Sequence, residues 1–199
     1  MSFKYGIVIT GSIATGKSTA SNILKLLGFR VIDADKIAHK ILNQQINKIE
    51  ELFGKEVIKD NQVDRKALGE IVFNNKEKLK ELENLLHPLI REEILSQAKR
   101  QEEFKKPYLI ELPLFFEKRE KYPFSKSVVV YAPREIELER LIKRENLSKD
   151  EAKRRIALQM DIEKKKEMAD FIIDNSKDLK HLQKECERFK KKILEETKN

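Results

Sequence analysis

The stretch "VITGSIATGKST" (Val8–Thr19) decides the fold that we expect of this chain. A short apolar run ends at a glycine, and a second glycine, a lysine and hydroxyl residues follow. Residues 11–18 fit the pattern G-x-x-x-x-G-K-[ST]. Glycines at these positions let the backbone turn tightly and approach a phosphate chain closely. The stretch therefore predicts a phosphate-binding loop between a strand and a helix.

Strand and helix patterns flank this loop. Phe3–Thr10 carries β-branched and aromatic residues, which favour a buried strand. Lys17–Leu27 has apolar residues at helical spacing, and Gly28 is placed to end that helix. A second strand is expected at 30–35, so the chain opens as a β-α-β unit, which favours a parallel sheet. An ordinary glycine-rich turn with an exposed lysine is the alternative, but the strand–loop–helix context favours phosphate binding.

The rest of the chain alternates between apolar runs and long helical patterns. Buried strands are expected at 108–112, 127–132 and 170–174. Helical patterns fill 36–106, and 54–64 is expected to form a polar tip loop within them. The expected fold class is α/β, with a parallel sheet flanked by helices in three layers.

A single domain of residues 1–199 is expected. The segment of about 36–106 is long for a simple crossover and predicts a nested helical lobe, and 134–159 carries a further helical pattern. This second pattern breaks at 146–148, where Ser148 is expected to cap the next helix. An amphipathic helix over 178–197 closes the chain.

Composition bounds the class of protein. Of the 199 residues, 40% are hydrophobic and 38% are charged, which is typical of a soluble globular protein. There is no apolar run long enough to span a membrane and no signal-peptide pattern, so a cytoplasmic location is expected. The single cysteine, Cys186, excludes an internal disulfide. The net charge of +8 suits an anionic partner, which could be nucleic acid, an acidic membrane or a small polyanion such as a nucleotide. We interpret the lysine-rich runs 163–167 and 188–192 mostly as solvated helix faces.

Further motifs follow the loop in a set order: GFRVIDADKIAHKI (28–41), LENLLHPLIREEI (82–94), PYLIELPLFFE (107–117), RENLSKDEAKRRIALQM (144–160) and ADFIIDNS (169–176). This order, over nearly the whole chain, resembles that of dephospho-coenzyme A kinases. The resemblance implies a P-loop kinase core with a helical substrate-binding insertion and a helical lid over about 140–160. It also implies ATP and Mg²⁺ as cofactors, and transfer of the γ-phosphoryl group of ATP to the ribose 3′-hydroxyl of dephospho-CoA.

Within the loop, Lys17 is expected to reach the outer phosphates and Ser18 to ligate Mg²⁺ directly. Members of the family usually have glycine where this chain has Ser12 and Ala14. A residue forced to positive φ at position 12 would be strained, but neither position is a fixed glycine of the general pattern. The residues expected to bind the nucleotide are Gly11, Ala14, Thr15, Gly16, Lys17, Ser18, Thr19 and, by resemblance, Asn175 in a loop near the adenine, where a backbone contact is the expectation.

Two aspartates end the second expected strand, beside the end of the first. Ligands of open α/β sheets bind at the carboxyl ends of strands. A kinase that transfers to an alcohol gains from a carboxylate that orients the hydroxyl and accepts its proton. From the residues alone, Asp35 is equally explained as a helix N-cap, whereas the resemblance assigns it as the base. Asp33 faces away or supports Mg²⁺ through water.

The motif HPLIR places an imidazole and a guanidinium about one helical turn apart. Pro88 suits the first turn of a helix, which would leave His87 near its N-cap and Arg91 on the same side. A structural cap with a surface arginine is the alternative. The resemblance favours substrate contact for both, and His39 is expected to line the same pocket.

Other positions are open to two interpretations each. Glu111 ends an apolar strand and either supports Mg²⁺ through water or forms a partly buried salt bridge. Leu112 and Pro113 follow it and are expected to contact the acceptor. Asp64 and Arg65 are expected in the acceptor pocket, although helix capping explains Asp64 equally well.

Arginines flank the break in the lid. Arg140 and Arg144 are spaced to share one helix face, where they could stabilise the charge on a transferring phosphoryl group. Arg155 is the next candidate, and exposure to solvent is the alternative for all of them. We expect Lys17, Asp35, Arg140 and Arg144 to form the catalytic set.

Rival functions share the loop but not the other motifs. Another P-loop kinase of nucleosides or nucleotides would lack the HPLIR and PLFFE pair. A nucleotide-dependent switch or an RNA-binding module would use the basic surface, but the chain has no aromatic interleaving of an RNA platform. The expected partners are therefore the small molecules ATP and dephospho-CoA, without nucleic acid or membrane, and a monomer is favoured.

Overall fold

A computed structural model of the chain describes residues 3–117 and 122–198. The chain divides into two compact units, one formed by Met1–Ile32 with Ala98–Asn199 and one formed by Asp33–Gln97. The second unit covers most of the segment in which the sequence predicts a helical lobe. Among the described residues, no helix is long and apolar enough to cross a membrane.

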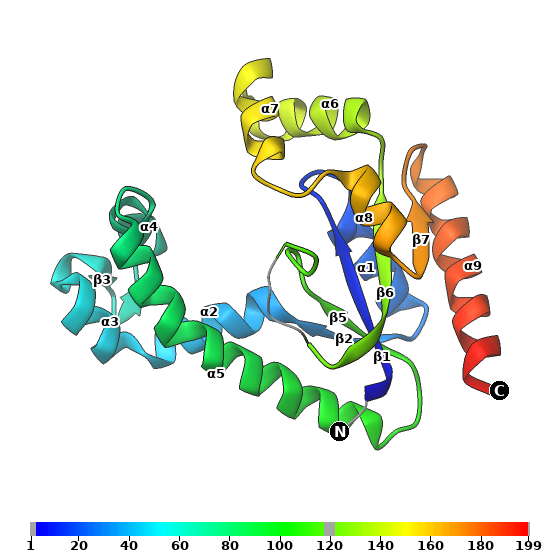
Figure 1. Cartoon of the computed structure of the whole chain (residues 1–199), viewed down its shortest axis with the longest axis horizontal. Coiled ribbons are helices and arrows are strands. Elements are labelled where there is room, and N and C mark those ends of the chain that lie inside the picture. Colours follow the sequence, from blue (N-terminus) through cyan, green and yellow to red (C-terminus); the bar gives the residue numbers. More distant parts are fainter. Residues whose placement is uncertain (1–2, 118–121, 199) are drawn as a thin grey trace. The chain divides into compact units, whose positions relative to one another are not determined.

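The first unit is built on a five-stranded sheet with the order β2-β5-β1-β6-β7 (Figure 1). Its strands are β1 (Phe3–Gly11), β2 (Arg30–Asp33), β5 (Tyr108–Glu111), β6 (Phe124–Tyr131) and β7 (Phe171–Asp174). β1 pairs in parallel with β5 and β6, and β6 pairs in parallel with β7. The α/β expectation is confirmed, and each expected strand exists with ends shifted by a few residues at most.

One detail of the expected sheet is wrong. The two aspartates were expected beside the end of the first strand, but β5 lies between β1 and β2. The acid next to the end of β1 is therefore Glu111, whose register partner on β1 is Ile9. A β-α-β pattern fixes the parallel direction of its two strands but not whether a third strand inserts between them.

Two helices cover one face of this sheet. α1 (Lys17–Leu26) and α9 (Leu179–Lys198) pack on alternate residues of the central strands. Cys186 lies fully buried in this cluster, as its apolar neighbours predict. Gly28, at φ 99°, follows the end of α1, which confirms its predicted role as helix terminator.

Three short helices follow β6: α6 (Arg134–Glu145), α7 (Lys149–Ala157) and α8 (Ile162–Met168). Ser148 caps α7 in a reciprocal capping box with Glu151, so the predicted cap is confirmed. α6 and α7 share a small apolar cluster around Leu141, Ala152 and Ile156, and α8 contacts β6.

The second unit is mostly helical. It holds α2 (Ala34–Gln44), α3 (Ile46–Phe53), a 3₁₀ turn η1 (Lys55–Val57), strands β3 (Ile58–Lys59) and β4 (Gln62–Val63), α4 (Arg65–Phe73) and most of α5 (Lys76–Glu102). The predicted tip loop at 54–64 is instead a 3₁₀ turn with a two-stranded hairpin, whose tip residues Asp60 and Asn61 take positive φ. Strands of only two residues are too short to show the alternation of apolar and polar residues by which a strand is predicted from sequence.

Proline 88 does not begin a helix. α5 runs unbroken from Lys76 to Glu102 with Pro88 inside it, so the expectation that His87 lies near an N-cap is wrong. Proline removes one backbone hydrogen bond, but strong helix formers on both sides continue the helix through it. His87 and Arg91 still share one face of α5, because they are four residues apart.

Candidate active site

The phosphate loop connects β1 to α1, as the sequence predicts. Gly16 is the N-cap of α1 with φ 89° and ψ 22°, a left-handed conformation that favours glycine. A Cβ atom on Gly16 would lie 2.1 Å from Asn175 Nδ2. That amide is buried and donates a hydrogen bond to the carbonyl of Thr15 at 2.7 Å. Glycine is therefore required at position 16 by both conformation and space.

The amino end of α1 suits an anion. Among the described residues, no side chain caps this end, and its first turn carries no acid. The free N–H groups and the helix dipole together favour a negatively charged ligand such as a phosphate. Ser18 and Thr19 lie exposed in this first turn.

The interior of the loop is held by its own residues. Thr15 Oγ1 donates to the carbonyl of Ser12 at 2.9 Å. Ala14 has a positive φ of 64°, whereas Ser12 does not have a positive φ. The backbone strain that a non-glycine residue would cause at position 12 therefore occurs at position 14. Ala14 and Ile13 also pack against the apolar cluster of α6 and α7, which joins the loop to the predicted lid.

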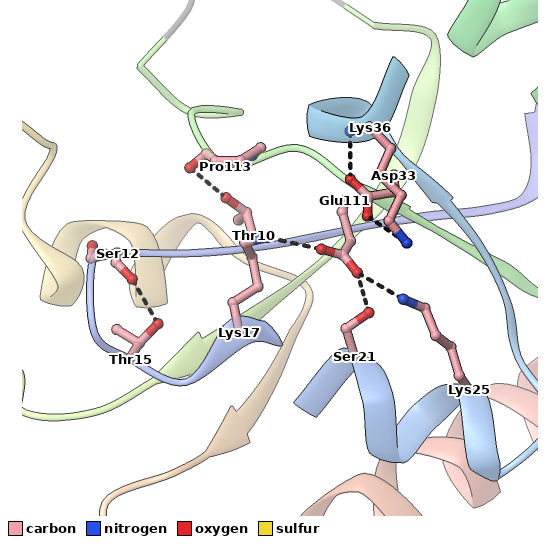
Figure 2. A network of polar contacts seen from close by, with 10 residues as sticks. All are labelled: Thr10, Ser12, Thr15, Lys17, Ser21, Lys25, Asp33, Lys36, Glu111 and Pro113. Carbon is pink, nitrogen blue, oxygen red and sulfur yellow. Dashed lines mark hydrogen bonds and ion pairs between the residues drawn. The ribbon is translucent and has the colours of Figure 1, made fainter. Parts of the chain in front are cut away.

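Glu111 anchors the lysine of the loop (Figure 2). Lys17 Nζ lies 3.0 Å from Glu111 Oε2, and Lys25 Nζ lies 3.7 Å from Glu111 Oε1. Ser21 Oγ also donates to Glu111 Oε1. The salt bridge that the sequence left as one of two interpretations is thus present, and the carboxylate is compensated by two cations and a hydroxyl. A water-mediated contact between Glu111 and a metal stays a prediction.

The residues after β5 are held against β1 by backbone contacts. The N–H of Leu112 donates to the carbonyl of Ile9 at 3.1 Å. Figure 2 shows the second bond, in which Thr10 Oγ1 donates to the carbonyl of Pro113 at 3.1 Å. These bonds fix the 112–113 backbone at the carboxyl end of the sheet, where ligands of this fold class bind.

Asn175 makes hydrogen bonds through both its backbone and its side chain. Its N–H donates to the carbonyl of Tyr131 and so extends the pairing of β6 with β7. Its amide group donates to the carbonyl of Thr15 and so supports the loop. The expected backbone contact of Asn175 with adenine stays a prediction.

The lid arginines have different surroundings. Arg140 Nη2 donates to the carbonyl of Lys177 at 3.3 Å, and its buried Nη1 has no hydrogen-bond partner among the described residues. Arg144 and Arg155 both pair with Glu145, and both side chains are about half exposed. Of these three arginines, only Arg140 has a buried donor without a partner among the described residues.

Three polar residues near the loop were missed by sequence reasoning. Lys165 is fully buried and donates to the carbonyl of Gly11, Glu117 pairs with Lys165, and Gln159 accepts from the N–H of Ile13. The interpretation of the run 163–167 as a solvated helix face is wrong for Lys165, whose side chain has no exposed surface. The signal that could have found Lys165 is its spacing of three from Ile162, which places both on the buried face of α8.

Glu137 is a second buried charge of this region. It lies on α6 with neither carboxylate oxygen hydrogen-bonded among the described residues. Burial raises its pKa to about 7, against the lowering effects of Arg134 and Lys165, while Asp161 and Glu163 raise it further.

In the second unit, Asp33 rather than Asp35 caps the helix. Asp33 accepts from the N–H of Lys36 at 3.1 Å, and its carboxylate lies 3.7 Å from Lys36 Nζ. Asp35 is an exposed residue of the first turn of α2. The alternative interpretation of Asp35 as the N-cap is therefore wrong, because the cap position falls two residues earlier.

The predicted substrate residues of this unit lie on three helices. Asp64 caps α4 by accepting from the N–H groups of Lys66 and Ala67, so the capping interpretation is confirmed. His87 Nε2 lies 3.7 Å from Glu83 Oε1 on α5. The others are Arg65 on α4, His39 on α2 and Arg91 on α5.

A parallel sheet with a phosphate loop between β1 and α1 defines a P-loop kinase core. The family model for dephospho-CoA kinase matches residues 5–181. The dephospho-CoA kinase of Sulfurimonas denitrificans is 51% identical over 193 residues, which cover 97% of this chain and 96% of that protein. That of Helicobacter pylori strain J99 is 46% identical over 196 residues, covering 98% of this chain and 100% of that protein.

A solved structure agrees with these sequence matches. The dephospho-CoA kinase from Campylobacter jejuni superposes with a TM-score of 0.73 at 42% identity, covering 96% of this chain and 98% of that one. The chain belongs to the dephospho-CoA kinase family. The resemblance drawn from the motifs is thereby confirmed.

Proposed function

We propose that the chain carries out the family's reaction with the residues named below. The γ-phosphoryl group of ATP passes to the ribose 3′-hydroxyl of dephospho-CoA, which gives coenzyme A and ADP. The observation that carries the proposal is the loop of residues 11–18, with an uncapped helix end and a lysine held beside it. This arrangement is built for a phosphate chain.

Lys17 acts on the outer phosphates of ATP. Its side chain is 14% exposed and its Nζ atom is held by Glu111. When a phosphate draws the ammonium group away, Glu111 keeps Ser21 and Lys25 as partners. The buried carboxylate is therefore not left uncompensated, which would otherwise be costly. Nucleotide contacts of the other loop residues, and of Asn175 near the adenine, belong to the same proposal.

Asp35 accepts the proton of the acceptor hydroxyl. The ribose oxygen forms a bond to the γ-phosphorus, the bond from that phosphorus to the β–γ bridging oxygen breaks, and ADP leaves. The proton of the hydroxyl moves to the Asp35 carboxylate. This role is supported by the local structure, because Asp33 supplies the helix cap and capping no longer accounts for Asp35.

The remaining site residues orient substrate and neutralise charge. Arg140 and Arg144 stabilise the transferring phosphoryl group, and the buried Nη1 of Arg140 supports this role for the first of them. The residues assigned to dephospho-CoA are His39, Asp64, Arg65, His87, Arg91, Leu112 and Pro113. The capping bonds of Asp64 leave its second carboxylate oxygen, Oδ2, outside the cap.

Mg²⁺ fits the donor set of the loop. Magnesium takes few protein ligands and completes its shell with phosphate oxygens and water. The exposed hydroxyl of Ser18 in the first turn of α1 would hold it, and the carboxylate of Glu111 would support it through water. Bound there, the ion would neutralise charge on the β- and γ-phosphates.

Comparison of acceptors tests the proposal. ADP release is measured with dephospho-CoA, AMP or a nucleoside as sole acceptor, and only dephospho-CoA is expected to support turnover. Equal turnover with AMP would favour the rival nucleotide kinase. Steeply salt-dependent binding of RNA without phosphorylation would favour a nucleic-acid module. We also propose that the protein is a monomer, which gel filtration would test, and that it is located in the cytoplasm.

A further inference from the structure

Lys165 lies buried beneath the start of the phosphate loop. Its side chain has no exposed surface, although it stands in a run of three lysines. Its Nζ atom donates to the carbonyl of Gly11 at 3.1 Å and lies 2.6 Å from Glu117 Oε1. It is the one fully buried lysine among the described residues.

A contribution to the stability of the fold does not explain why Lys165 and Glu117 are buried as an ion pair. Taking an ammonium group and a carboxylate out of water costs several kcal/mol for each ion, and apolar residues of similar size often stabilise a protein as well or better. Glu117 Oε2 is also buried without a partner among the described residues. A geometric role accounts for the pair better than a stabilising one.

The contact with Gly11 supplies that geometric role. A phosphate loop works when successive N–H groups converge on the anion, and a carbonyl turned toward the phosphate would repel it. Gly11 ends β1, and a glycine restricts the direction of the peptide that follows less than other residues do. The charged donor of Lys165 holds the Gly11 carbonyl in one direction and so sets the orientation of the peptide that begins the loop.

The same cluster reaches the segment between α7 and α8. Gln159 Oε1 accepts from the N–H of Ile13 at 2.8 Å, and Glu117 Oε1 accepts from the N–H of Met160 at 3.2 Å. Residues 159–160 are therefore tied to the loop at Ile13 directly, and to Gly11 through Glu117 and Lys165.

We propose that Lys165 is a positioning residue. Together with Glu117 it fixes the direction of the Gly11 carbonyl, and it connects the segment that follows α7 to the phosphate loop. The inference rests on the proposed role of the loop as the nucleotide cradle. Lys165 does not touch the reacting atoms; it acts through the loop backbone.

The test compares Lys165→Met with Lys164→Met, a matched control that removes an exposed lysine of the same helix. Calorimetry measures the affinity for ADP, steady-state kinetics measures KM for each substrate and kcat, and thermal unfolding without ligand measures stability. For Lys165→Met, ADP affinity is expected to fall about tenfold to hundredfold. This range corresponds to the contribution of one charge-assisted hydrogen bond. The KM for dephospho-CoA is expected to stay within twofold, and the control variant to match wild type in all readouts.

A second variant keeps the test decisive if Lys165→Met fails to fold. Glu117→Gln preserves size and one acceptor oxygen, and it is expected to weaken ADP binding in the same direction but less. Unchanged ADP affinity in a folded Lys165→Met or Glu117→Gln protein, with only a lower unfolding temperature, would overturn the positioning role. Absence of ADP binding by the wild-type protein would instead overturn the proposed function of the loop.

Discussion

The replacement of Gly16 by alanine tests the loop geometry in two separable parts. Alanine at φ 89° adopts a left-handed conformation that costs about 1–2 kcal/mol. The new Cβ would also lie 2.1 Å from Asn175 Nδ2, so the buried amide must move. Loss of its hydrogen bond to Thr15 leaves a buried group unsatisfied, at about 1–3 kcal/mol. The expected loss of unfolding free energy is about 2–5 kcal/mol.

Gly28→Ala isolates the conformational part. Gly28 has φ 99°, and a Cβ there would meet no atom of the described residues within 4 Å. This variant is expected to lose only about 1–2 kcal/mol, so the difference between the two variants measures the displacement of Asn175. Urea unfolding followed by circular dichroism gives both values. Equal losses in the two variants would refute the steric reasoning, as would a structure of Gly16→Ala with Asn175 unmoved.

Three further experiments test the roles of Asp35, Glu137 and Cys186. Asp35→Asn is expected to lower kcat by about 10²–10⁴ while ATP still binds, and near-normal turnover would remove Asp35 from the base role. The pKa of Glu137 is raised from its ordinary value to about 7, so between about pH 4.5 and 7 the folded state holds a proton that the unfolded chain has released, and stability falls as pH rises through this window. Glu137→Gln should flatten this fall in urea midpoints measured across the window, and an unchanged slope would contradict the assignment. Burial raises the pKa of the Cys186 thiol to about 12, so a thiol reagent at pH 8 should label the unfolded protein and spare the native one, and rapid labelling of native protein would contradict the buried position.

Local sequence patterns were sufficient to predict most elements of the fold. The glycine, lysine and hydroxyl spacing located the loop, apolar runs located the strands, and Ser148 and Gly28 marked helix ends through their own backbone chemistry. Two expectations failed for different reasons. The insertion of β5 between β1 and β2 depends on long-range pairing, which no local pattern shows. The passage of α5 through Pro88 depends on the helix formers on both sides of the proline, which outweigh the usual preference of proline for a first turn.

The site divides in the same way. Lys17, Gly16 and Glu111 could be predicted because a motif or a strand end marks them, and their contacts agree with that placement. Lys165 is harder to recognise, because one buried lysine in a run of three differs from its neighbours only by the helix face on which it lies, and its spacing of three from Ile162 is the sequence signal of that face. The partner of its charge, Glu117, is 48 residues away in sequence, and no local pattern joins the two.

The position of the transferred phosphate tests the central claim most directly. The wild-type protein is incubated with ATP carrying a labelled γ-phosphate and with dephospho-CoA as sole acceptor, and the label is located in the product by phosphorus NMR and mass spectrometry. We expect one labelled phosphate on the ribose 3′-oxygen, with ADP formed in equal amount. Label found only in inorganic phosphate, or on another oxygen of the acceptor, would contradict it.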